Sequence, residues 1–389
     1  MISKGLTRLF LMAQVCCLLG CVTTSPRVLS PSYSAEVSKV LEGKAILGHS
    51  VTEAELPQFD VFRITPEMLA FAQAAVRRGD TYFDRVKSLH VALLSSSSAG
   101  GRGIVYNSYF TETPEVTFAQ RKANCLSFTL LYVALARAVG INALVNEVQI
   151  PPTWDLRNKK DMVFFRHVNV KVPVSRENPN VLNNDDVIID LEMSRFRSNY
   201  SQYPINDVSA TAQFYSNRAM EFLERDQYAD AFLSLRKSID LNSRQAYVWG
   251  NLGVLYSRLK LWKEAEVAYL QGLSVEPTHL TLMNNLSYLY RQTGNKELAD
   301  KYSRLAQKYR ESNPFFQFSL AQSAFEEGNY LAAEALISRA IKLQDNDARF
   351  YELAAAIDEK LNRPNHQADM LKKAKKYKRL DVYLSEHVL

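Results

Sequence analysis

The chain has 389 residues, of which 47% are hydrophobic and 23% are charged, and its formal net charge is +6. This length allows two domains with buried cores, and this composition excludes disorder along the whole chain. Four cysteines are present, but Cys16, Cys17 and Cys21 all lie in the first 21 residues. A short apolar segment at this end of a chain is typical of a targeting signal.

The first 20 residues have the pattern of a secretory signal. Lys4 and Arg8 provide a basic start, and the run LFLMAQVCCLLG provides an apolar stretch. A membrane-spanning helix needs roughly 20 apolar residues, and this run is shorter. Gly20 places a small residue directly before Cys21, as a cleavage site requires. These features predict a signal peptide over residues 1–20.

The string LLGC that ends at Cys21 resembles the lipobox of bacterial lipoproteins. That resemblance implies cleavage before Cys21, lipidation of its thiol by diacylglycerol, and a polar tether over residues 21–35. Val22 rather than aspartate follows Cys21, which in the enteric sorting rule implies the outer membrane, with the protein facing the periplasm. The alternative is an ordinary short signal anchor in which Cys21 has no role.

Lipidation of Cys21 leaves Cys125 as the one free thiol of the mature chain. No intrachain disulfide bond can then form, even in an oxidising periplasm. A lone cysteine in that compartment is a liability for oxidation, so we expect Cys125 either to be buried and inert or to have a reactive role.

Helices are expected in the first part of the mature chain. Thr65 is a suitable N-cap, and Pro66 suits the first position of the helix that follows. The Ser- and Gly-rich run SSSSAGGRG, residues 95–103, predicts a mobile loop. The three helical patterns lie at residues 34–47, 65–79 and 80–95.

Strands are expected after Cys125. Three short runs rich in β-branched residues alternate with turn-rich segments, as in a sheet. Helices followed by a group of strands predict an α+β domain, which we place at residues 36–205. The three runs are NALVNEVQI, MVFFRHVNVKV and DVIIDLEM.

Cys125 is expected at the first turn of an apolar helix that ends near Gly140. The unpaired amides and the positive dipole end of a helix N-terminus stabilise a thiolate, and Arg121 and Lys122 add positive charge. A nucleophilic cysteine also needs a base and a group that orients the base. His167 and Asp190 are the candidates, because each interrupts a hydrophobic strand, where a polar side chain is costly without a partner.

A cysteine that opens a helix, a histidine on one strand and an aspartate on the next resemble the transglutaminase-like superfamily. The segments NCLSFTLLYVALARAVGI, RHVNV and VIIDLEM are similar to its bacterial cysteine peptidase branch, over roughly residues 100–200. The resemblance implies a papain-like fold with Cys125 as nucleophile, His167 as general base and acid, and Asp190 as the residue that orients the imidazole.

The helix-capping position of Cys125 implies that its backbone amide is one oxyanion donor. Asn124, Gln120 and Trp154 are nearby candidates for the second donor, without a motif that selects one. Each residue of the triad also has a structural alternative: a small core cysteine, a hydrogen-bonded strand histidine and a turn aspartate.

Residues 206–389 are self-similar with a fixed period. Two series of small residues recur every 34 positions, and the second unit has the fullest pattern, with Trp249, Gly253 and Tyr256 among its aromatic and small positions. This spacing resembles the tetratricopeptide repeat, which implies an all-α solenoid of about four repeats. The two series are Ala219, Gly253, Ser287 and Ala321, and Ala231, Ala265, Ala299 and Ala333.

A fifth, capping unit is expected at the end, where Gln367 replaces the small residue and Pro364 interrupts the pattern. Its basic run, Lys372 to Arg379, is expected to be the solvated face of the capping helix, with a weak membrane-surface contact as the alternative. The repeats imply a protein or peptide partner in their groove, and the periplasmic address argues against nucleic acid.

The chain contains neither a GxxxxGK[ST] nor a GxGxxG phosphate loop, and neither a CxxC nor an HExxH motif. The sequence therefore supports no nucleotide, cofactor or metal chemistry. It predicts an envelope lipoprotein with a thiol acyl-transfer site, a cysteine peptidase or amidase whose repeats hold the substrate. The alternative is a non-catalytic scaffold, and a third possibility is that the helices before residue 100 gate the site as a pro-segment, with residues 95–103 as hinge.

Overall fold

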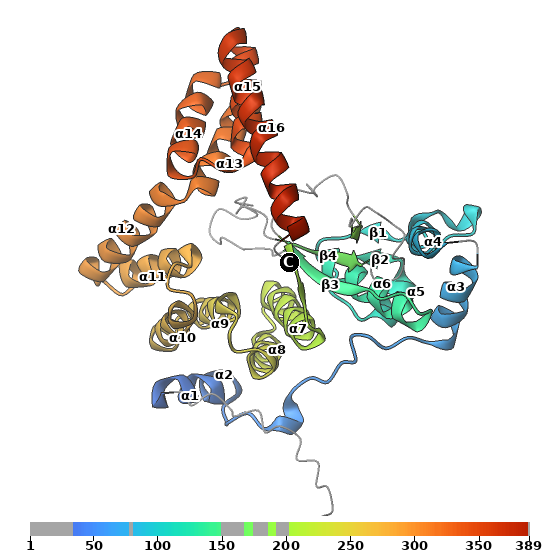
Figure 1. Cartoon of the computed structure of the whole chain (residues 1–389). Helices are drawn as coiled ribbons and strands as arrows, with labels where there is room; N and C mark the ends of the chain where they lie inside the picture. Colours follow the sequence, from blue (N-terminus) through green and yellow to red (C-terminus); the bar gives the residue numbers. More distant parts are fainter. Residues whose placement is uncertain (1–33, 78–80, 149–166, 174–185, 192–201, 388–389) are drawn as a thin grey trace, which may run out of the picture.

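The computed structural model describes residues 34–77, 81–148, 167–173, 186–191 and 202–387 (Figure 1). The predicted signal peptide, the lipidation site Cys21 and nearly all of the tether lie outside the described residues. Within the described ranges, no helix is both long and apolar enough to cross a membrane.

The predicted N-terminal helices are present. Their bounds are α1 Ala35–Glu42, α2 Lys44–Leu47, α3 Pro66–Val76 and α4 Tyr82–Leu94. The Thr65 hydroxyl accepts a hydrogen bond from the Met68 amide, and Pro66 is the first residue of α3, as the sequence predicts. Gly43 divides the first predicted helix in two, because its backbone has φ +72°, a conformation that favours glycine.

The segment 95–103, predicted to be a mobile loop, is hydrogen-bonded to α4 and to α5 (Pro114–Gln120) at its C-terminal end. The Arg102 and Ile104 amides donate to the carbonyls of Ala92 and Leu93, at 2.7 and 3.0 Å. The Arg102 side chain also donates to the Phe118 carbonyl at 2.7 Å. Hydrogen bonds of this kind hold the loop against α4 and argue against its use as a hinge.

The predicted strands form an antiparallel sheet with the order β5-β4-β3-β6. The three strands expected from the sequence are β3 Leu144–Val148, β4 His167–Val172 and β5 Val187–Ile189. An edge strand that the sequence analysis missed, β6 Gln202–Ile205, pairs with β3. A separate parallel pair joins β1 Val105–Tyr106 to β2 Lys122–Ala123.

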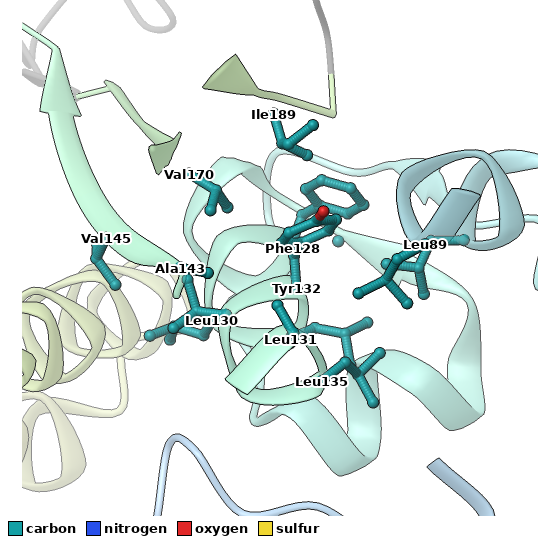
Figure 2. Close-up of a cluster of buried hydrophobic side chains, with 14 of the residues drawn as sticks. Leu89, Phe128, Leu130, Leu131, Tyr132, Leu135, Ala143, Val145, Val170 and Ile189 are labelled. Carbon is teal, nitrogen blue, oxygen red and sulfur yellow. The ribbon is translucent and has the colours of Figure 1, made fainter. Parts of the chain in front are cut away.

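Helix α6, Cys125–Ala138, is the centre of this part of the molecule, and nearly all of its residues are buried. Phe128 and Tyr132 lie near Val170 and Ile189 of the sheet, and Leu131 and Leu135 lie on the side of α4 (Figure 2). A helix that is apolar all round must be covered on all sides, and here α3, α4, α5 Pro114–Gln120 and the sheet cover it. Helices α3 and α4 are therefore core elements and not a removable pro-segment.

The repeats form antiparallel helix pairs that follow one another in a curved array from α7 to α16 (Figure 1). Small residues at the crossing points allow the close approach: a Cβ at Gly253 would lie 2.3 Å from the Tyr269 ring. The other seven members of the two series of small residues are all 2% exposed or less. The helices are α7 Asp207–Glu224, α8 Tyr228–Leu241, α9 Ala246–Arg258, α10 Trp262–Val275, α11 Leu280–Gln292, α12 Lys296–Ser312, α13 Pro314–Glu326, α14 Tyr330–Leu343, α15 Ala348–Lys360 and α16 Pro364–His387.

The capping unit is formed by α15 and α16. Pro364 lies at the first position of α16, where the missing N–H is not needed, so it starts a helix and does not interrupt one. Ala374 is buried, whereas Lys372, Lys373, Lys375 and Lys376 around it are exposed. In the part of the basic run whose side chains are described, the lysines therefore lie on a solvated face, as predicted.

Helix α7 joins the two parts of the molecule. Its Phe214 and Tyr215 belong to the core around α6, whereas Ala219 and Leu223 belong to the core of the repeats. Asp207 at its start also forms a salt bridge with Arg137 of α6, at 2.7 Å. The predicted domain boundary between residues 205 and 206 lies just before the start of α7. The helix itself packs against both parts of the molecule.

Helices α1 and α2 lie against the repeats. Val37, Val40 and Leu41 are buried in the repeat core, and the Tyr256 hydroxyl donates to the Val40 carbonyl at 2.6 Å. The range 36–205 that the sequence analysis assigned to the first domain therefore begins with helices that contact α8 and α10 (Figure 1). A short amphipathic helix can pack against the core around α6 or against the core of the repeats. Its sequence pattern does not distinguish the two.

Candidate functional site

Asn124 fixes the start of α6 and thereby the position of Cys125. Its side-chain oxygen accepts a hydrogen bond from the Ser127 amide at 2.8 Å, which makes it the N-cap and Cys125 the first helical residue. The preceding helix α5 ends at Arg121 with φ +58°, and β2 carries the chain into the cap. The sequence prediction that Cys125 opens this helix is confirmed.

The structure brings Cys125, His167 and Asp190 together. His167 Nε2 lies 2.5 Å from Asp190 Oδ2, and Cys125 lies close enough to His167 to raise the pKa of its imidazole. Asp190, directly after β5, is almost fully buried, with 1% of its side chain exposed. Cys125 is half-buried. Cys125 lies on α6 and His167 on β4, as the sequence predicts, whereas Asp190 directly follows β5 and does not lie within the strand.

The electrostatics of the site favour a protonated imidazole. Burial lowers the pKa of His167, but its hydrogen bonds with Asp190 and Cys125 and the charges of both raise that pKa to about 10. An imidazolium beside a thiol stabilises the thiolate, which is the nucleophilic form of cysteine. The amide of Cys125 also lies at the positive end of α6.

His90 of α4 is a residue of this site that the sequence analysis missed. Its Nε2 lies 3.1 Å from the backbone oxygen of Asp190, and its ring packs edge-on against Phe128 and Tyr132. Burial lowers the pKa of His90, so its neutral form can donate this hydrogen bond. It holds the chain at the end of β5, and no sequence motif signals such a contact between a helix and a distant strand end.

Of the candidates for a second oxyanion donor, only Gln120 and Asn124 lie within the described residues. Gln120 is exposed at the end of α5, and the Asn124 amide already serves as the cap and donates to Thr111 Oγ1 at 2.7 Å. Trp154 lies outside the described residues.

A pocket lies between this part of the molecule and the repeats. On one side it is bounded by the segment before α5, by Asn124 and Leu126 at the start of α6, and by Val168 of β4. The other side is formed by α7 and α9, the first helices of two successive repeats. Its repeat side is lined by Gln213, Asn217, Met220, Glu221, Glu224, Tyr247 and Asn251.

The repeat side of the pocket follows the period of the repeats. Gln213 and Tyr247 occupy equivalent positions in successive units, and so do Asn217 and Asn251. Equivalent positions on stacked helices present a continuous surface. This surface faces the start of α6, whereas α1 and α2 cover the second helices, α8 and α10.

A chain of hydrogen bonds links α7 to the start of α6. The Thr111 amide donates to Glu221 Oε1 at 2.7 Å, and Thr111 Oγ1 accepts from the Asn124 amide. Arg218, one turn before Glu221, donates to the Thr111 carbonyl at 3.1 Å and pairs with Glu112. No local pattern predicts these contacts, because Thr111 and Glu221 are 110 positions apart.

Comparison with known proteins identifies the repeats. Residues 246–279 and 280–313 match the family model of the tetratricopeptide repeat. The chain therefore contains tetratricopeptide repeats, as their spacing predicts, and these form a module for protein–protein interaction.

Among known proteins, the tetratricopeptide repeat-containing protein trd-1 of Caenorhabditis elegans is 33% identical over 88 residues, which are 23% of this chain and 11% of that protein. Two similar solved structures are a MamA protein, at 18% identity over 42% of this chain and 90% of that one, and YrrB, described as a TPR protein with an unusual peptide-binding site, at 20% identity over 46% and 91%. Their TM-scores are 0.23 and 0.24, so they carry no argument about this chain.

Proposed function

We propose that this protein binds polypeptide partners on the first-helix face of its tetratricopeptide repeats, as a scaffold of the bacterial envelope. The observation that carries the proposal is the pocket in which Gln213, Asn217, Tyr247 and Asn251 line up across two successive repeats. The side-chain amides of Asn217 and Asn251 can pair with the N–H and C=O groups of an extended chain. Gln213 is buried and donates to Glu147 at 2.6 Å, so it shapes the pocket.

Site-specific photo-crosslinking tests this binding. A photoreactive residue at Asn251 should capture a polypeptide in the cell envelope, whereas the same residue at the exposed Leu270 of α10 should capture much less. Asn217→Arg should reduce capture at Asn251 by filling the pocket. Equal capture at both positions would argue against binding on the first-helix face.

A second function, favoured by the convergence of Cys125, His167 and Asp190, is acyl transfer on the bound polypeptide. The Cys125 thiolate attacks the carbonyl carbon of an amide, and the Cys125 amide stabilises the resulting oxyanion. The imidazolium of His167 gives its proton to the leaving amine, which leaves a thioester on Cys125. The neutral imidazole then takes a proton from water, whose oxygen attacks the thioester and releases the acid and the thiolate.

In this proposal Asp190 holds the imidazole and stabilises its charge, and α6, β4 and β5 adopt the transglutaminase-like arrangement that their sequence resembles. An amine in place of water would give cross-linking, and we favour hydrolysis. The Cys125→Ala and His167→Ala variants separate the two functions. Both variants should still crosslink the partner at Asn251. If the protein is an enzyme, its uncleaved target should also accumulate in cells that carry either variant. Full processing of the target by Cys125→Ala would remove the acyl-transfer function.

We also propose that Cys21 carries the lipid that anchors the protein to the outer membrane, as the lipobox-like string suggests. Cys21→Ser should move the protein from the membrane fraction to the soluble periplasmic fraction. A Cys21→Ser protein that stays in the membrane fraction would argue for a signal anchor.

A further inference from the structure

The pocket between α6 and the repeats has a distinct charge. Glu221 and Glu224 are among its lining residues, and among the lining residues that the structure describes there is no lysine or arginine. The chain as a whole has a formal net charge of +6, so this pocket departs from the average of the molecule. Such a local excess of carboxylates attracts a cationic group.

The nearest basic side chain of α7 is used elsewhere. Arg218 donates to the Thr111 carbonyl at 3.1 Å and forms its salt bridge with Glu112. It partly offsets the charge of Glu221 from a distance, but burial still raises the pKa of Glu221 to about 7. A carboxyl removed from water in this way gains most from a cation that enters the pocket beside it.

The remaining lining fits the rest of a polypeptide. Leu126, Val168 and Met220 provide apolar surface for the methylene stem of a long basic side chain. Asn217 and Asn251 provide amides for the backbone on either side of it. The charge, the apolar surface and the amides therefore match one kind of ligand.

We propose that this pocket binds a lysine or arginine side chain of a polypeptide that lies across α7 and α9, with Glu221 and Glu224 as the carboxylates that recognise it. This proposal rests on the polypeptide-binding function above and states which residue the partner must carry. The bound side chain lies next to the residues that flank Cys125 in the sequence, and Glu221 reaches the cap of α6 through Thr111. Recognition of a basic residue would thus take place at the start of α6.

The test uses the full chain with Cys125→Ala, so that catalysis cannot alter the peptides. The probes are acetylated and amidated nonapeptides of Gly and Ser with a central lysine, or with the uncharged norleucine in its place. Calorimetry is performed at about pH 8, where Glu221 is ionised. The lysine peptide should bind about tenfold more tightly, because a charge-assisted hydrogen bond in a partly buried site is worth about one power of ten or more in affinity.

Glu221→Gln keeps the oxygen that accepts from the Thr111 amide but removes the charge, and it should lower the preference for lysine to about threefold or less. Glu224→Gln should have a smaller effect, because Glu224 is exposed. Glu115→Gln on α5, also exposed and outside the pocket lining, is the matched control and should keep the preference.

Equal affinity for the two peptides, or a lysine preference that survives in the Glu221→Gln/Glu224→Gln double variant, would overturn the proposal. The proposal would also be overturned if neither peptide bound. If the repeats bind polypeptides without recognising a basic residue, these results should occur while crosslinking at Asn251 is unchanged. An absence of crosslinking at Asn251 is a separate result, and it would contradict the proposed polypeptide binding itself.

Discussion

The repeats and the Cys125 site are built from contacts of different range. In the repeats, each helix packs mainly against the helix before it and the helix after it, so the core is a sum of similar local units. At the Cys125 site, by contrast, single hydrogen bonds join His90 to Asp190 across 100 positions and Thr111 to Glu221 across 110. Stability should therefore respond most to changes in the repeats, and chemistry to changes at the site.

The largest expected effect is in the repeat core. Trp249 is fully buried in the second repeat, so Trp249→Ala should lower the free energy of unfolding by about 3–5 kcal/mol. Urea unfolding followed by circular dichroism measures the loss. Tyr288→Ala on α11, where 56% of the side chain is exposed, is the control and should change little. Equal losses for both variants would contradict the packing described for the repeats.

A smaller effect on stability, with a large effect on ionisation, is expected at Asp190. Asp190→Ala removes the partner of a buried imidazolium and should cost about 2 kcal/mol near pH 6, because His167 can lose its proton in response. NMR titration should show the pKa of His167 falling well below its value of about 10 in the unchanged protein.

The sign of the pH dependence follows from the raised pKa of His167. Its stabilising contribution is fully present below the unfolded value of about 6.5 and is lost as the pH rises through about 10. The difference in unfolding free energy between the unchanged protein and Asp190→Ala should therefore shrink above pH of about 10. A difference that stays constant up to that pH would mean that the pair is not an ion pair.

The caps of α6 and α7 allow a matched comparison between the two regions. Asn124 and Asn206 each accept a hydrogen bond at 2.8 Å from the third residue after them, and Asn206→Ala should cost about 1 kcal/mol. Asn124→Ala should cost more, about 2 kcal/mol, because it also removes the buried hydrogen bond to Thr111. Only Asn124→Ala should also slow the alkylation of Cys125, because only that cap positions the thiol. If Asn206→Ala slows alkylation equally, the effect is one of general stability.

The smallest expected effect concerns α1. Tyr256→Phe removes the hydrogen bond to the Val40 carbonyl and should cost about 0.5–1.5 kcal/mol. Amide hydrogen exchange in residues 35–42 should become faster while exchange in α6 stays unchanged. Unchanged exchange in residues 35–42 would show that the buried Val37 and Leu41 hold α1 without this bond.

The same difference in range explains what the sequence could predict. The repeats are signalled by local spacing, and the order of Cys125, His167 and Asp190 on a helix and two strands follows from short patterns. Three features depend on the tertiary arrangement, which produces no periodic pattern in the sequence. They are the edge strand β6, the contact of His90 with Asp190 and the packing of α1 on the repeats. Gly43 shows this best, because its role is visible only with the Phe232 ring 2.2 Å from where a Cβ would lie.

The rate at which iodoacetamide alkylates Cys125 tests the central claim, that Cys125, His167 and Asp190 form one site with an activated thiol. The rate is followed by mass spectrometry of the peptide that contains Cys125, in the full-length protein, between about pH 5 and pH 9, and is compared with His167→Ala. We expect Cys125 to be alkylated faster at neutral pH than a free cysteine peptide, and we expect His167→Ala to lose this advantage. A rate that matches the free peptide and does not change in His167→Ala would contradict it.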